Sequence, residues 1–95
     1  MNTSIYNKLK EIKPILKQRY GIEEFALFGS QARDDYSENS DIDIAILKIT
    51  KKDYFIRANA KYFLEDVFDK NIDIGYFDSM RNVIAEYVKK DMIYV

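Results

Sequence analysis

The chain has no cysteine and no histidine among its 95 residues. The absence of cysteine excludes disulfides, thiol nucleophiles and thiolate metal sites, and it is typical of a protein of the reducing cytoplasm. Without histidine, the Ser-His and Cys-His nucleophilic pairs and the usual zinc ligand sets are excluded as well. Carboxylates are the only strong metal ligands left, so any metal ion bound here has oxygen ligands.

Glycine is scarce, and its three occurrences are Gly21, Gly29 and Gly75. This spacing excludes a Walker loop and the G-x-G-x-x-G fingerprint, because both need closely spaced glycines. Long hydrophobic runs are also lacking, since no stretch approaches the roughly 20 apolar residues of a membrane span. Residues 1–9 have none of the charged and apolar blocks of a signal peptide. We therefore expect a cytoplasmic protein with no membrane association.

The residues that are present describe an ordinary globular chain. Hydrophobic residues make up 47% of the sequence and charged residues 33%, as in a typical folded domain. A chain of this length forms about one small domain, which we expect to span residues 1–95. The formal net charge of −1 provides no overall attraction for a phosphate backbone, so stable nucleic-acid binding is not expected.

Hydrophobic periodicity predicts a first helix that ends near Gly21, where a left-handed residue suits a helix stop. Its apolar face consists of Ile5, Leu9, Ile12 and Leu16. Because Pro14 removes a backbone donor inside this helix, we expect a kink or a break near Ile12. Residues 24–28 form the first predicted strand, which ends at Gly29-Ser30.

A short helix is expected to begin at residues 31–33, followed by a surface loop at 34–40 and a second strand at 41–47. Thr50 and Asp53 resemble a capping box for a helix of about four turns. Residues 71–77 form a third strand, and Asp78 or Ser79 is expected to cap a last helix. Residues 92–95 are expected to add a short edge strand. This order predicts an α/β (α+β) fold, a small mixed sheet with helices packed on it.

Asp41 and Asp43 are the first candidates for chemistry. Residues two apart on a strand point to the same face, about 6.5 Å apart along the backbone. Magnesium prefers oxygen ligands, and two such ions about 3.5 to 4 Å apart are used in phosphoryl chemistry. Asp73 lies in a matching context, because residues 41–44 read DIDI and residues 71–74 read NIDI. We expect it on a neighbouring strand as a third ligand.

Gly29-Ser30 is the candidate phosphate site. Glycine lets the backbone approach a ligand closely, the serine hydroxyl can donate a hydrogen bond, and the N–H groups that open a helix are unpaired. Arg33, one turn further, either neutralises a phosphate or pairs with an acid of the loop. Each feature alone is also explained by a plain turn or by solvent-facing charges. Their combination is hard to explain by packing, because two neighbouring acids on an apolar strand repel each other.

The pattern of Gly29-Ser30, ten intervening residues and then Asp41-x-Asp43 resembles the signature of the DNA polymerase beta superfamily. The short chain is similar to the minimal nucleotidyltransferase (MNT) branch of that superfamily. The resemblance implies that Gly29 and Ser30 bind a triphosphate and that Asp41, Asp43 and Asp73 bind the magnesium ions. In the same pattern, Arg33 matches a basic position of the family, whereas Gln31 stands where many relatives have a basic residue.

Members of this branch are typically paired with a HEPN-domain ribonuclease toxin. The resemblance implies that this protein is the antitoxin of such a pair and transfers AMP from ATP to a tyrosine of the toxin, releasing pyrophosphate. Two alternatives stay open: a non-catalytic antitoxin that covers its toxin and carries a vestigial site, and a nucleotidyltransferase that modifies a small molecule. The last needs an acceptor pocket, and relatives with that activity usually carry additional helices.

Overall fold

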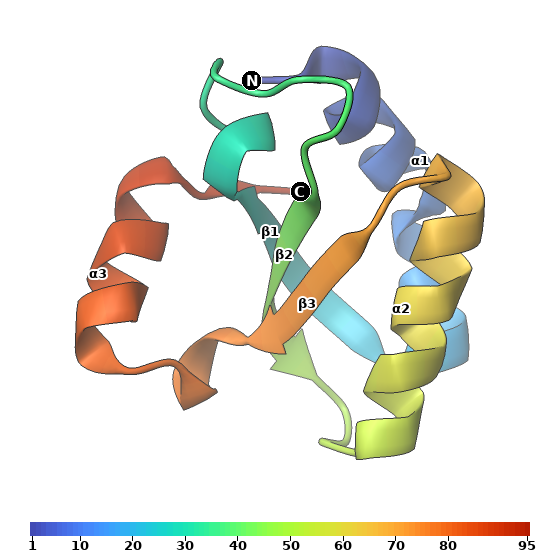
Figure 1. Cartoon of the computed structure of the whole chain (residues 1–95). Helices are drawn as coiled ribbons and strands as arrows, with labels where there is room; N and C mark the ends of the chain where they lie inside the picture. The colour runs from blue at the N-terminus through green and yellow to red at the C-terminus, as the bar shows by residue number, and fades with distance from the viewer.

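The computed structural model of residues 1–95 is a four-stranded mixed sheet with three helices packed around it (Figure 1). Its strands are β1 (Ile22–Phe28), β2 (Ile42–Ile49), β3 (Ile72–Tyr76) and β4 (Ile93–Tyr94), in the spatial order β3-β2-β1-β4. β1 pairs antiparallel with β2 and with β4, and β2 pairs parallel with β3. The fold class expected from the sequence is confirmed.

Helix α1 (Thr3–Tyr20) buries the four apolar residues that the periodicity predicts. It ends at Gly21, whose φ of 69° is left-handed, as expected for a glycine stop. The predicted break near Ile12 is wrong, because the helix is continuous through Pro14. Pro14 lies on the exposed side of the helix, where water can hydrogen-bond the carbonyl that the proline leaves without a donor.

The two later helices begin differently from the sequence expectation. The backbone N–H groups of Phe55 and Ile56 donate to the side chain of Asp53, which alone caps α2 (Tyr54–Phe68). Thr50 is not part of the cap, since its backbone N–H donates to Gly21 at the end of β2. The expected cap of α3 (Asn82–Asp91) by Asp78 or Ser79 is wrong, because both residues lie in a 3-10 turn, Phe77–Ser79, that ends before the helix. The residue that precedes α3 is Arg81, whose side chain makes no capping hydrogen bond.

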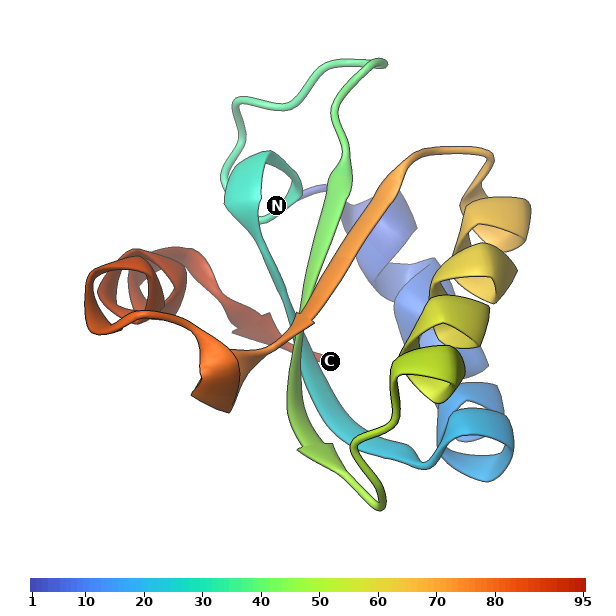
Figure 2. The same ribbon diagram turned by 60° about the horizontal axis from the view of Figure 1, so that its bottom comes forward.

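The two faces of the sheet are covered unequally. Helices α1 and α2 lie together against one face, and α3 lies on the opposite side (Figures 1 and 2). The main core fills the space between the sheet and α1 and α2, and its strand residues include Ile42, Ile44, Ile46 and Ile72. In α3 only Val88 is buried. Burial of aliphatic side chains therefore holds one face of the sheet much more firmly than the other.

None of the helices has both the length and the apolar character needed to cross a membrane.

Candidate active site

The predicted phosphate turn follows β1 directly. Gly29 has φ +72° and opens a 3-10 turn, Gly29–Gln31, which begins two residues earlier than the sequence suggests. The backbone N–H groups of Ala32 and Arg33 both donate to the Gly29 carbonyl, at 3.1 and 3.0 Å. N–H groups that open a helical turn have no partner within it and are therefore available to an anion. Ser30 is half-buried at the surface of this turn.

The candidate carboxylates come from adjacent strands. In the register of the sheet, Phe28 of β1 is opposite Asp43 of β2, and Asp43 is opposite Asp73 of β3. The structure thus brings Asp43 and Asp73 side by side, as the sequence predicts. Asp41 lies immediately before β2 and is exposed. None of these three carboxylates takes part in an ion pair.

Gly29 and Asp43 are in direct contact across the strand pair. A Cβ atom placed on Gly29 would lie 2.1 Å from the Oδ2 atom of Asp43. Only glycine avoids this clash, and only glycine adopts the positive φ without strain. The local backbone therefore places the phosphate turn and the carboxylate next to each other, and a side chain between them would separate the two.

Asp43 has an unusual charge environment. Burial, and then the negative charges of Asp73 and Asp41, raise its pKa to about 6, while Arg33 opposes the shift. A cation between the carboxylates would remove this electrostatic cost. No three acidic side chains of the chain lie close enough together to hold a metal ion as they stand. The donor set itself, unpaired carboxylate oxygens on neighbouring strands, fits a hard divalent cation such as magnesium.

Arg33 makes the ion pair that was one of its two expected roles, and a second one that sequence reasoning missed. Its guanidinium lies 3.3 Å from the carboxylate of Asp35 in the loop and 2.9 Å from that of Asp91. Asp91 is the last residue of α3. Both pairs are exposed, so each contributes little to stability. Their structural effect is to connect the phosphate turn to the end of α3.

We call the three candidate carboxylates, Asp41, Asp43 and Asp73, the carboxylate row. Two hollows lie beside it. The first, of about 240 Å³, lies between the phosphate turn and α3, and its lining includes Phe28, Gly29, Ile84 and Tyr87. The second, of about 220 Å³, lies beside β3, and its lining includes Tyr54, Arg57, Lys61, Tyr62 and Asp73. The sequence gives no sign of either, because the helical residues are far from the motif along the chain.

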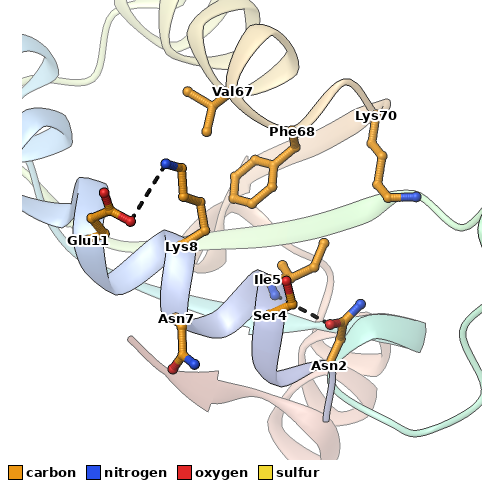
Figure 3. Close-up of a pocket in the computed structure, with 9 residues that line it drawn as sticks. All are labelled: Asn2, Ser4, Ile5, Asn7, Lys8, Glu11, Val67, Phe68 and Lys70. Atoms are coloured by element: carbon orange, nitrogen blue, oxygen red, sulfur yellow. Dashed lines mark hydrogen bonds and ion pairs between the residues drawn. The ribbon is translucent and has the colours of Figure 1, made fainter.

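A larger hollow of about 560 Å³ lies between the start of α1 and the end of α2. Figure 3 shows its lining, with Lys8 and Glu11 on one side and Phe68 and Lys70 on the other. None of the candidate residues lines it. We therefore regard the carboxylate row, and not the largest hollow, as the candidate site.

Paired carboxylates beside a glycine turn suit a site at which metal ions assist the displacement of a phosphate group. The chain belongs to the nucleotidyltransferase domain family, whose sequence model matches residues 9–95.

Individual relatives are similar over nearly the whole chain. A provisionally named protein adenylyltransferase of Methanocaldococcus jannaschii is 32% identical over 94 residues, which cover 98% of this chain and 96% of that protein. The protein adenylyltransferase MntA of Thermococcus cleftensis is 31% identical over 85 residues, covering 87% and 84%. A crystal structure of a toxin-antitoxin with AMP-PNP contains a chain with a TM-score of 0.76 and 26% identity, covering 90% of this chain and 69% of that one.

Proposed function

We propose that this protein is an adenylyltransferase that attaches AMP from ATP to a tyrosine of a HEPN-domain toxin and thereby acts as its antitoxin. The full-length similarity to protein adenylyltransferases supports the reaction. The similarity to a chain of a toxin-antitoxin with AMP-PNP supports both the nucleotide and the partner. We further propose that residues 1–95 form a single catalytic domain, and that it works in the cytoplasm, where cysteine-free chains are common.

The observation that carries the proposal is the contact between the turn and the carboxylates. Gly29 leaves no room for a side chain beside Asp43, and Asp43 is paired in register with Asp73. A triphosphate held by the backbone N–H groups of the turn would therefore reach directly to the carboxylate row. Nucleotidyl transfer needs both parts in contact, because the phosphate must meet its charge-neutralising groups without an intervening side chain.

In this proposal Gly29 and Ser30 bind the triphosphate through backbone N–H groups and the serine hydroxyl. Asp41, Asp43 and Asp73 would hold magnesium ions. When bound, such ions neutralise phosphate charge and stabilise the attacking and leaving oxygens. Arg33, paired at present with two acids, lies close enough to the turn in sequence to add positive charge to the triphosphate. The apolar hollow between the turn and α3 would receive the base of the nucleotide.

The reaction itself is a displacement at the α-phosphate. The tyrosine oxygen forms a bond to the α-phosphorus, the bond from that phosphorus to the pyrophosphate oxygen breaks, and pyrophosphate leaves. With no histidine in the chain, we propose that a carboxylate accepts the proton of the tyrosine hydroxyl. Asp73 is the best placed, because it lies at the end of the row away from the phosphate turn.

A second candidate function is neutralisation by binding alone. Several large apolar side chains are exposed and could form a partner interface: Tyr54 at 67%, Phe55 at 73% and Tyr87 at 66%. The two functions differ in their response to loss of the carboxylates. A cell that expresses the HEPN toxin should be protected by the wild-type protein and not by Asp43→Asn combined with Asp73→Asn. Full protection by the double variant would favour binding alone.

A further inference from the structure

The hollow beside β3 has no role in binding the nucleotide as proposed above. We call it the β3-edge hollow and define it by Tyr54, Arg57, Lys61, Tyr62 and Asp73. The sheet register places the phosphate turn at one end of the carboxylate row and Asp73 at the other. A displacement at phosphorus requires the attacking oxygen to approach opposite the leaving group. With the pyrophosphate at the turn, the acceptor must arrive from the side of Asp73.

The side chains of this hollow suit an acidic peptide. The guanidinium of Arg57 lies 5.9 Å from the ring centre of Tyr54 and 5.1 Å from that of Tyr76, which fixes its position. Lys61 lies one helical turn further along α2. Neither cation takes part in an ion pair. Tyr54 and Tyr62 present exposed rings beside them. β3 is also an outer strand of the sheet, so its free edge can pair with an extended segment.

We propose that the β3-edge hollow is the docking site for the acceptor, an extended and acidic segment of the partner protein that carries the tyrosine to be modified. This inference rests on the proposed function. Arg57 and Lys61 bind carboxylates that flank the acceptor tyrosine, and the rings of Tyr54 and Tyr62 pack on its side chain. Asp73 is then the only candidate metal ligand that contacts both the nucleotide site and the acceptor site.

The test uses two labelled tyrosine peptides, one with glutamates and one with lysines flanking the tyrosine. Their binding to the full chain with AMP-PNP and magnesium is measured by fluorescence anisotropy. We expect the acidic peptide to bind more tightly, and Arg57→Glu with Lys61→Glu to weaken it about tenfold. The matched control, Lys10→Glu with Lys17→Glu on the exposed face of α1, should leave binding of the acidic peptide unchanged.

Equal binding of the two peptides, or an equal loss in both charge-reversal variants, would overturn the docking site. Affinity for AMP-PNP is measured on the same samples and should be unchanged in all of them. A wild-type protein that fails to bind AMP-PNP would instead contradict the proposed function, so the two failures are distinguishable.

A different observation concerns Gln31, the one polar side chain that is buried completely. Its Oε1 atom accepts from the Asn2 side chain at 2.9 Å, and its backbone carbonyl accepts from the Asn2 N–H at 2.8 Å. Its Nε2 atom donates to the carbonyl of Ser40 at 3.3 Å. One buried side chain therefore connects the phosphate turn, the start of α1 and the residue that precedes Asp41.

We infer that Gln31 is a positioning residue that holds Asp41 near the phosphate turn. Its side chain is fully buried, so it does not contact a triphosphate bound at the surface of the turn. The loop 34–40 is exposed except at Ser40. Without the hydrogen bond to Ser40, the segment that carries Asp41 would lose its connection to the turn and would fluctuate more freely.

The test compares Gln31→Met and Gln31→Leu, neither of which can donate to Ser40, with Asn2→Ala. Each of the three removes a buried hydrogen bond or a cap and lowers the melting temperature, but only the Gln31 variants lose the bond to Ser40. Binding of Mn²⁺ in the presence of AMP-PNP is followed by the loss of its free EPR signal. We expect about tenfold weaker Mn²⁺ binding in the Gln31 variants, and an unchanged affinity in Asn2→Ala and in the exposed control Gln18→Glu.

Unchanged Mn²⁺ affinity in folded Gln31→Met or Gln31→Leu would overturn the positioning role and leave Gln31 as a structural residue only. If Gln31→Met fails to fold, Gln31→Leu decides, because its side chain also lacks a donor for Ser40 and adds no charge. A wild-type protein that does not bind Mn²⁺ would contradict the proposed metal site itself.

Discussion

The two faces of the sheet are built from alternate residues of the same strands and have opposite characters. On one face Ile42, Ile44 and Ile72 pack against α1 and α2 and are almost fully buried. On the other face Asp43 and Asp73 stand beside each other. The isoleucines stabilise the fold, whereas the carboxylates repel each other. Along each strand, residues that stabilise the core thus alternate with residues of the candidate site. Substitutions on one face should therefore change the stability, and substitutions on the other should change the activity.

The largest effect is expected from Asp43→Asn. Loss of one of the proposed carboxylate ligands should lower the rate of AMP transfer about 10³-fold, since metal stabilisation of the transition state supplies several kcal/mol. The fold should be retained, because the change removes a charge and keeps the shape. Transfer of label from ATP, measured together with the thermal unfolding curve, checks both statements.

Ile44→Ala changes the residue next to Asp43, which faces the core, and should lower the stability without lowering the activity. Ile44 is 1% exposed, so its truncation should lower the free energy of unfolding by about 2 to 5 kcal/mol. Activity per folded molecule should change little. Urea unfolding gives the stability, and transfer assays well below the unfolding midpoint give the activity. If Ile44→Ala had normal stability and no activity, the claim that the core face determines stability and the carboxylate face determines activity would be wrong.

Gly29→Ala should lower both the stability and the activity, because Gly29 has a left-handed backbone and also contacts Asp43. A left-handed backbone costs alanine about 1 to 2 kcal/mol, and its methyl group would push against the carboxylate of Asp43. We expect weaker ATP binding and a slower reaction, with Gly75→Ala as the matched control, because a Cβ at Gly75 meets no atom within 4 Å. Similar losses of ATP affinity and rate in Gly29→Ala and Gly75→Ala would argue that the contact between Gly29 and Asp43 has no special role.

The dependence of stability on pH follows from the raised pKa of Asp43, about 6 in the fold and about 3.9 in an unfolded chain. The folded state binds the proton more tightly, so this group favours folding at low pH and loses that contribution as the pH rises through 6. Asp43→Asn should therefore be more stable than wild type above pH 6, by about 1 kcal/mol once solvent screening is included, and equal to it near pH 3.

The smallest effect is expected for the ion pair between Arg33 and Asp91. Because the pair is largely exposed, Asp91→Asn should change the free energy of unfolding by less than about 1 kcal/mol. Its effect on ATP affinity is the informative quantity. Release of Arg33 from one of its two acids should leave ATP affinity unchanged or increase it, as isothermal titration would show.

The sequence predicts the sheet and the carboxylate row because both depend on local patterns. Alternation in DIDI and NIDI fixes which residues face the core, and the parallel pairing of β2 and β3 then brings Asp43 beside Asp73. The prediction of a break near Ile12 is wrong, because a rule about one residue ignored the packing of Leu9 and Leu16 that keeps the helix continuous through Pro14.

The contacts that sequence reasoning missed are long-range. Asp91 reaches Arg33, and Gln31 reaches Asn2 and Ser40, only because α3, α1 and the loop converge on the phosphate turn in three dimensions. Such contacts have no periodic signal. The one available clue to Gln31 was its departure from a basic position in the resemblance, and that clue alone does not distinguish a buried hydrogen-bonding role from a weakened phosphate site.

The most direct test of the account is transfer of labelled AMP from ATP to the HEPN toxin, by wild type, Asp43→Asn and Ile44→Ala, each at equal concentrations of folded protein and with saturating magnesium. We predict a labelled toxin tyrosine with wild type and with Ile44→Ala, and almost no label with Asp43→Asn. Equal labelling by wild type and Asp43→Asn, or no labelling by any of the three, would contradict the assignment of catalysis to the carboxylate face.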